Sequence, residues 1–168
     1  MPEGKLSSLI STLSLQPHPE GGYYKETYRS KDLVSTLELP DRFQGSRCFA
    51  TSIYFLLVKD NFSAFHRIKS DETWHFYEGS PIEIIMINRT GKLIIQVLGN
   101  DWSKGQVPQF TVPAMTWFGS RVIGGDYGLA GCTVYPGFDF SDFEMAERKI
   151  LQEKFPMHSK VIKELTRE

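Results

Sequence analysis

One stretch of the sequence, residues 63–79, concentrates the residue types that most often carry chemistry. It holds two of the four histidines, His66 and His75, and the carboxylates Asp71 and Glu72. A histidine near its ordinary pKa of about 6.5 can both accept and donate a proton, and a neighbouring carboxylate can orient it. Histidines and carboxylates are also ligands of divalent metals. The stretch therefore predicts either an acid/base site or a metal site.

Strand patterns surround this polar stretch. Residues 48–58 form a nearly continuous apolar run, which is typical of a buried strand. Residues 82–88 and 92–98 predict a hairpin joined by a short turn that contains Gly91. Further short strands are expected at residues 23–30, 106–112, 116–123 and 129–135. The pattern favours an all-β sandwich or barrel that carries a site among its strands.

Helical patterns appear only near the two ends of the chain. The spacing of Leu6, Leu9, Ile10 and Leu13 predicts a short helix that ends before Pro17. At the other end, Ser141 and Asp142 predict the start of a helix, and Pro156 separates it from a brief last one. Three phenylalanines are expected to pack this helix onto the outside of the barrel: Phe138, Phe140 and Phe143. We expect one domain over residues 1–168, with a barrel core at about 21–138 and C-terminal helices at about 141–166.

The composition argues against several classes of partner. The 168 residues are 40% hydrophobic and 23% charged, with a net charge of −1 and no long run of Lys or Arg. The sequence therefore predicts no nucleic-acid partner and no attachment to a membrane. Cys48 and Cys132 each lie in an apolar stretch and are expected to be buried free thiols. The first residues lack the apolar run of a signal peptide, so a cytoplasmic location is expected.

The histidine stretch and a later segment resemble the two motifs of the cupin superfamily, a group of jelly-roll barrels. The first motif reads roughly His-x-His, then Glu, then Gly, and it is matched at His66, Ile68, Glu72 and Gly79. The second reads roughly Pro-x-Gly, then His, and its places hold Pro113, Met115 and Phe118. Ile68 and Phe118 thus stand where metal-binding cupins have histidines.

A closer resemblance is to the fifth cupin family, which is catalogued as a domain of unknown function. The matching phrases, spread over roughly residues 5–165, are Pro17–Gly22, Thr51–Leu57, Phe65–Arg67, Asp71–Tyr77 and Val134–Phe138. The resemblance implies a cupin-type jelly roll similar in fold to sugar-nucleotide epimerases, and it implies a homodimer. An aromatic strand at residues 23–30 could also add to the sheet of a partner copy.

Two kinds of chemistry are compatible with the cluster around His66. For acid/base chemistry, His66 would be the base, Asp71 or Glu72 would orient it, and a tyrosine would supply the acid. The tyrosine candidates are Tyr54, Tyr77 and Tyr135. No metal is expected as a cofactor, but a rearranged divalent site would use His66, Glu72 and His75. In a regular strand Glu72 and His75 face opposite sides, so that site would need a bulge. The alternative is a hydrogen-bonded polar lining.

Other residues could form the walls of a ligand pocket. The expected lining comprises Trp74, His75, Phe76, Trp117 and Phe118, although plain core packing is the better explanation of any single ring. Glu20 and His18, in a turn rich in Pro and Gly, could close over the barrel mouth or reach a partner copy. Arg29 could clamp a carboxylate or phosphate, unless it is only a surface charge.

The sequence leads to three functional hypotheses about a small-molecule ligand. The first is a sugar or sugar-nucleotide epimerase or isomerase that uses histidine-based acid/base chemistry. The second is a module that binds a small metabolite without catalysis, which the absent metal histidines favour. The third is a metal-dependent cupin with a rearranged ligand set.

Overall fold

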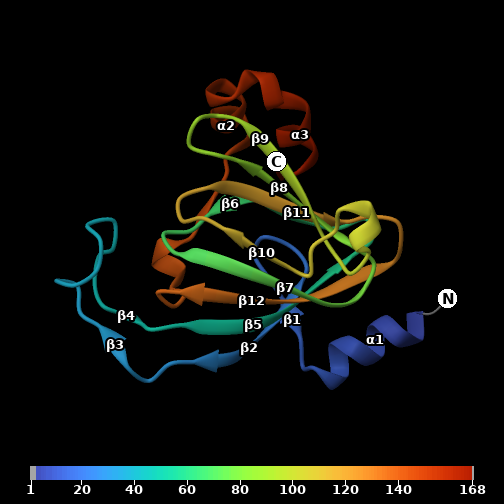
Figure 1. Cartoon of the computed structure of the whole chain (residues 1–168), viewed down its shortest axis with the longest axis horizontal. Helices are drawn as coiled ribbons and strands as arrows, with labels where there is room; N and C mark the ends of the chain where they lie inside the picture. Colours follow the sequence, from blue (N-terminus) through green and yellow to red (C-terminus); the bar gives the residue numbers. More distant parts are fainter. Residues whose placement is uncertain (1–2, 168) are drawn as a thin grey trace.

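The computed structural model describes residues 3–167, and two facing antiparallel sheets form its body (Figure 1). The larger sheet has the order β1 (Gln16–Pro17), β2 (Tyr23–Arg29), β5 (Thr51–Val58), β12 (Tyr127–Tyr135), β7 (Asp71–Gly79) and β10 (Gln109–Val112). The smaller sheet has the order β13 (Glu144–Met145), β6 (Phe62–Arg67), β11 (Trp117–Val122), β8 (Ile82–Ile87) and β9 (Leu93–Leu98). The short strands β3 (Leu33–Val34) and β4 (Arg47–Cys48) pair separately beside them. All the strands expected from the sequence are present, with their ends shifted by a few residues.

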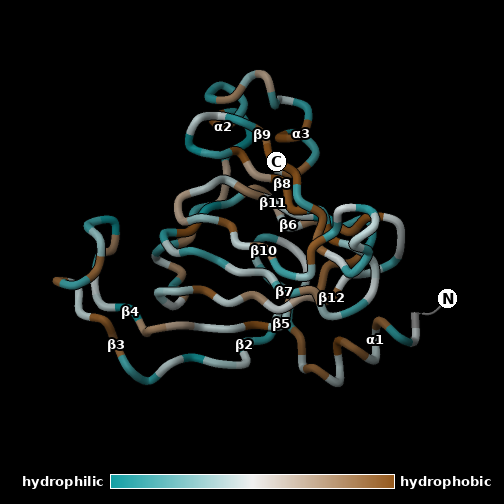
Figure 2. Tube along the Cα trace, in the orientation of Figure 1, coloured by the Kyte–Doolittle hydropathy of each residue, from teal (hydrophilic) through white to brown (hydrophobic). Residues whose placement is uncertain are grey.

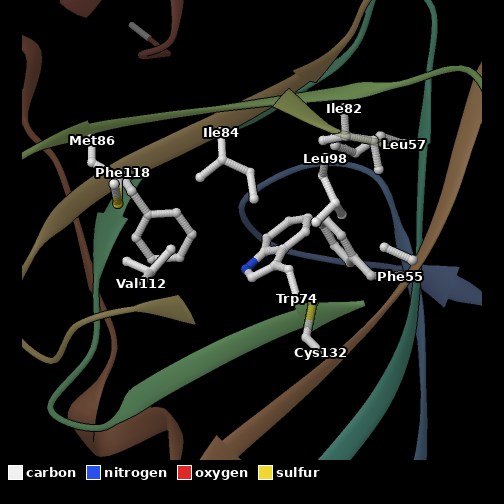
Figure 3. Close-up of a cluster of buried hydrophobic side chains, with 11 residues drawn as sticks. Phe55, Leu57, Trp74, Ile82, Ile84, Met86, Leu98, Val112, Phe118 and Cys132 are labelled. Atoms are coloured by element: carbon white, nitrogen blue, oxygen red, sulfur yellow. The ribbon is translucent and has the colours of Figure 1, made fainter. Parts of the chain in front are cut away.

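The main core lies between the two sheets and is made of alternate residues from both (Figure 3). Trp74 of β7 sits in its middle with 1% of its surface exposed, edge-on to Phe55 and Phe118. Ile84 and Met86 of β8 close the core from the smaller sheet. Alternation along each strand directs one set of side chains inwards, which is why β7 buries Trp74 and leaves its neighbour His75 partly exposed.

Helices cover the outer faces of the sheets near the two ends of the chain (Figure 1). Helix α1 (Glu3–Thr12) confirms the predicted N-terminal helix, and its apolar residues pack with Leu56 and Leu129 of the larger sheet. The alternation of hydrophobic and hydrophilic colour along α1 is visible in Figure 2. Helices α2 (Arg148–Lys154) and α3 (Ser159–Glu164) pack on the smaller sheet, where they bury Leu151 and Ile162. No described helix has the length and apolar character needed to cross a membrane.

The predicted start of the C-terminal helix at Ser141 is wrong. Residues Phe140–Asp142 form one turn of 3-10 helix, and the chain then adds strand β13 to the edge of β6 before α2 begins at Arg148. The side chain of Asp139 accepts a hydrogen bond from the backbone of Ser141, so the capping pattern belongs to this short turn. The helix starts later because residues 144–145 complete the sheet instead.

Candidate functional site

A cavity of about 520 Å³ lies beside β2, between the larger sheet and the segment that follows β12. Seven carboxyl, imidazole or guanidinium side chains line it: His18, Glu20, Glu26, Arg29, His66, Glu72 and Asp139. Glu26 and Arg29 have 41% and 46% of their side chains exposed, so they mark the solvent side. Glu20, His66 and Glu72 are buried and mark the inner side.

A glycine-containing turn places Glu20 against β6. The backbone amide of Ala64 donates to the carbonyl of Glu20 at 2.8 Å, which docks the turn on the strand that carries His66. Gly21 has a φ of 113°, and a Cβ there would come within 2.1 Å of the Phe62 carbonyl oxygen. Only glycine combines this left-handed backbone with such a close approach. The turn therefore fixes a carboxylate beside the histidine of the neighbouring strand.

The hydrogen bonds around His66 determine where its protons lie. Its Nδ1 is 2.7 Å from the carbonyl oxygen of Ala64, which can only accept, so Nδ1 carries a proton. Its Nε2 lies 3.1 Å from Oε2 of Glu20. Nδ1 of His18, 3.5 Å from the same oxygen, already accepts from the backbone amide of Glu20. One proton is therefore shared between Glu20 and His66, as acid and imidazole or as carboxylate and imidazolium.

Burial favours the uncharged form of this pair. Desolvation raises the pKa of Glu20, opposed by the nearby His18 and by the hydroxyl of Ser63, which donates to Oε1 at 2.8 Å. Desolvation also lowers the pKa of His66, and Glu72 opposes that shift. The shared proton can therefore move between Glu20 and His66 without leaving an isolated charge in the protein.

Glu72 is the second buried acid of the cavity. It comes from β7 of the larger sheet, whereas His66 comes from β6 of the smaller one. Burial, followed by repulsion from Glu20, raises the pKa of Glu72 to about 7. Cys132 lies next to it, and desolvation holds the pKa of this thiol well above its usual range. Cys132 is thus a neutral thiol and a poor nucleophile.

The raised pKa of Glu72 predicts a pH-dependent effect of Glu72→Gln on stability. An acid with a folded pKa of about 7 and an ordinary pKa of 4.5 destabilises the fold increasingly as the pH rises between these values. Glutamine removes that penalty. We expect the variant to gain on the order of 2–3 kcal/mol relative to the native protein between pH 5 and pH 8. Denaturant unfolding at both pH values measures this difference in the free energy of unfolding, and Glu153→Gln at an exposed position is the control. A gain that is the same at both pH values would contradict the assignment.

A β-bulge brings Arg29 to the cavity. Tyr24 and Glu26 share one face of β2, and regular strand alternation would place Arg29 on the opposite face. The register between β2 and β5 shifts between Glu26 and Tyr28, so Arg29 joins Tyr24 and Glu26 at the cavity. Its guanidinium donates to both carboxylate oxygens of Glu26, at 2.7 and 3.0 Å, and to the carbonyl of Phe138 at 3.1 Å.

The aromatic wall of the cavity corrects the expectation for the three phenylalanines near residue 140. Phe138, Phe140 and Phe143 line the cavity rather than packing α2 onto the barrel. The Phe143 ring lies 5.3 Å from the His66 ring, and the Phe140 ring stacks on His18 at 6.3 Å. These rings place an apolar surface directly beside His66 and His18.

Four other expected acid/base residues lie away from the cavity: Tyr54, Tyr77, Tyr135 and Asp71. Tyr54 packs under α1 in the outer cluster and contacts Tyr77, and the Tyr135 hydroxyl pairs with Thr73 on the outer face of the larger sheet. Asp71 accepts from the backbone amide of Ala114 at 2.7 Å, which makes it a turn residue. The tyrosine that lines the cavity is Tyr24.

The expected aromatic pocket is mostly core. Trp74 and Phe118 are each 1% exposed between the sheets, and Phe76 packs against the same cluster (Figure 3). Phe118 still touches the site, because its ring centroid lies 4.2 Å from that of His66. Trp117 lies in the second core, under the C-terminal helices. Alternation predicted the inward direction of Trp74 correctly, but the core fills the space in front of it.

The donor set around His66 does not fit a divalent metal. Among residues 3–167, no group of three or more His, Cys, Asp or Glu side chains has the geometry to hold one. The imidazole of His75 lies 3.4 Å from the hydroxyl of Thr133, a residue of β12 outside the cavity. His75 therefore does not join His66 and Glu72. Ile68 and Phe118 pack apolar surface where the resemblance would place ligands.

Comparison with known proteins assigns the family. A family model described as "Cupin superfamily (DUF985)" matches residues 7–146. The chain belongs to this family. The cupin-type fold expected from the sequence is therefore confirmed. Protein SO0799 from Shewanella oneidensis is similar to this cupin over 99% of both chains, with 38% identity and a TM-score of 0.87.

Two further relatives extend the comparison. The uncharacterized protein YML079W of Saccharomyces cerevisiae is 30% identical over 84% of this cupin and 75% of its own length. Oxalate decarboxylase from Bacillus subtilis matches 93% of this cupin and 38% of its own chain, with a TM-score of 0.56 and 15% identity. The last likeness concerns the fold alone.

Proposed function

We propose that this cupin catalyses reversible proton transfer on a small molecule, in a reaction of the epimerase or isomerase type. One observation carries the proposal: Nε2 of His66 lies 3.1 Å from the carboxylate of Glu20 in a cavity that also contains Glu72. Reversible transfer to and from carbon needs carriers whose pKa values lie near the working pH. The pKa of about 7 at Glu72 meets this condition.

The proposed roles follow from the proton positions. The Glu20–His66 pair is one carrier, because it holds a single exchangeable proton between Oε2 of Glu20 and Nε2 of His66. Glu72 is the second carrier, and Tyr24, which lines the cavity, would donate its hydroxyl proton to a substrate oxygen. Glu20 replaces Asp71 as the partner of His66, and Tyr24 replaces the tyrosines expected from the sequence. A covalent mechanism through Cys132 is disfavoured by the raised pKa of its thiol.

Deuterium incorporation from the solvent tests the proposal. The protein is incubated in D₂O with free sugars, amino sugars, sugar phosphates and nucleotide sugars. Mass spectrometry and NMR then detect deuterium bound to carbon. We expect incorporation next to a carbonyl carbon in at least one class, even where no net product accumulates. If a compound binds in the cavity and no member of the panel gains deuterium, the enzymatic proposal fails.

The second candidate is a module that binds a small metabolite without catalysis. It is favoured by the internal pairing of the site. Glu20 and His66 are hydrogen-bond partners of each other, and the hydroxyl of Ser63 donates to the second carboxyl oxygen of Glu20. Such a network also stabilises a cavity that only binds. Binding without carbon-bound deuterium in the same experiment is the result that selects this alternative.

We also propose a homodimer formed through the edge of the larger sheet. Strand β1 covers β2 only at Tyr23 and Tyr24, so the rest of that edge has no partner strand among residues 3–167. Tyr28, Leu33 and Phe49 near it are each more than half exposed. An uncovered strand edge with apolar neighbours is a site for strand addition. Light scattering should give twice the chain mass at micromolar concentration, and a monomer would refute the dimer.

A further inference from the structure

The charges that line the cavity are predominantly negative. Four carboxyl groups face it, Glu20, Glu26, Glu72 and Asp139, and Arg29 is the one Lys or Arg side chain among its lining residues in the described chain. Glu20 shares a proton with His66 and Glu26 is paired with Arg29, so the net negative charge of the cavity comes from Glu72 and Asp139. The two histidines add no fixed positive charge, because burial lowers the pKa of both His18 and His66. A ligand that enters therefore meets an acidic surface.

The nearby guanidinium groups are already engaged. Arg29 makes a two-pronged pair with Glu26 and a third bond to the Phe138 carbonyl, which uses the face that would otherwise clamp an anion. Arg47, behind the aromatic wall, is paired in the same way with buried Asp142, at 2.6 and 2.7 Å. A phosphate or carboxylate entering this cavity would have to break one of these pairs.

The aromatic rings of the wall also favour a positively charged ligand. Phe138, Phe140 and Phe143 lie together, with ring centroids between 4.9 and 6.3 Å apart. Tyr24 adds a fourth ring across from His18. The faces of such rings attract cations, and more strongly where water is excluded.

We propose that the ligand of this cavity is an organic cation, namely a protonated amine carried on an apolar or aromatic body, rather than a phosphorylated or carboxylated compound. The inference rests on the proposed function, because it names the substrate class of the same site. The ammonium group lies among the carboxylates, and the body packs on the phenylalanine wall. Nucleotide sugars, which the sequence left open as substrates, are thereby disfavoured.

A set of three ligands with one body and different charges tests the charge preference. The probes are 2-phenylethylamine, 2-phenylethanol and phenylacetate, titrated calorimetrically into the full-length protein at pH 7.5 and low salt. We expect the amine to bind at least about tenfold more tightly than the alcohol, and phenylacetate to bind most weakly. Equal affinities, tighter binding of phenylacetate, or no binding of the amine at concentrations up to about 10 mM would each overturn the inference.

The variant Glu26→Gln locates the effect in the cavity. It removes one carboxylate and releases the guanidinium of Arg29 at an exposed position that the fold tolerates. We expect the amine to lose affinity several-fold and phenylacetate to gain it. Glu153→Gln makes the same change in net charge on α2, outside the cavity, and should alter neither. Equal responses of the two variants would mean that the preference is only long-range attraction, and the inference would fail.

The outcomes separate this inference from the proposed function. Deuterium incorporation into a phosphorylated sugar would support proton transfer and overturn the cationic ligand. Preferential binding of amines, with no incorporation into any compound, would support the cationic ligand and overturn the enzyme.

Discussion

Replacing His66 by Asn is expected to lower the rate of carbon–deuterium exchange by about 10²–10⁴-fold, the usual contribution of a positioned general acid or base. The amide of Asn can still donate to the Ala64 carbonyl, which now accepts from Nδ1 at 2.7 Å. It has no group of suitable pKa to replace Nε2 beside Glu20. The variant should therefore bind its ligand and unfold close to the native protein while losing turnover.

The matched control for this variant is His75→Asn. Both histidines lie on strands of the first motif, but His75 faces Thr133 outside the cavity and makes no contact with Glu20 or Glu72. The control should keep full activity. The exchange rate of the native protein should also vary with pH near neutrality, following Glu72 and the Glu20–His66 pair. Equal losses in both variants, or no loss in His66→Asn, would remove His66 from the mechanism.

The fold could be predicted from the sequence because its signals are local. Strand alternation, the hairpin at residues 82–98 and the apolar face of α1 depend on neighbours a few residues apart, and each element is present. The start of the C-terminal helix could not be predicted in this way. Residues 144–145 pair with Arg67 and His66 across almost eighty positions of sequence, and this long-range pairing overrides the local helix signal.

The candidate site was predictable only in part, for the same reason. His66, Glu72 and Glu20 were singled out from their residue types and spacing, and the structure brings all three to one cavity. The choice of tyrosine depended on the faces of three different strands, and Tyr24 was missed. The approach of Arg29 depends on a bulge, which shifts the face of every later residue in β2. Backbone irregularities of this kind leave no clear signal in one sequence.

Replacing Arg47 by Met is expected to destabilise the protein by about 3–5 kcal/mol, because it leaves a buried carboxylate without its main partner. The side chains of Arg47 and Asp142 are only 6% and 3% exposed, and two short bonds join them. Lys69 lies 3.5 Å from Asp142 and replaces only part of the lost interaction. Chemical denaturation of the variant measures the loss.

A double variant and a surface control identify the cause. Combining Arg47→Met with Asp142→Leu removes both charges, so it should recover much of the stability that the single variant loses. Lys104→Met breaks the exposed pair with Asp101 and should change stability little. A double variant less stable than Arg47→Met would show that packing, and not the unpaired carboxylate, causes the loss.

The same ion pair connects stability with the cavity. Asp142 belongs to the turn that carries Phe140, and Phe143 follows it directly. Because Arg47 binds both Asp142 and the carbonyl of Gly45, it holds the aromatic wall against the loop before β4. Arg47→Met should therefore weaken ligand binding even at temperatures where the protein stays folded. His66→Asn should show the opposite combination, with binding kept and exchange lost. The two variants thus separate the residues that shape the cavity from the residues that transfer the proton.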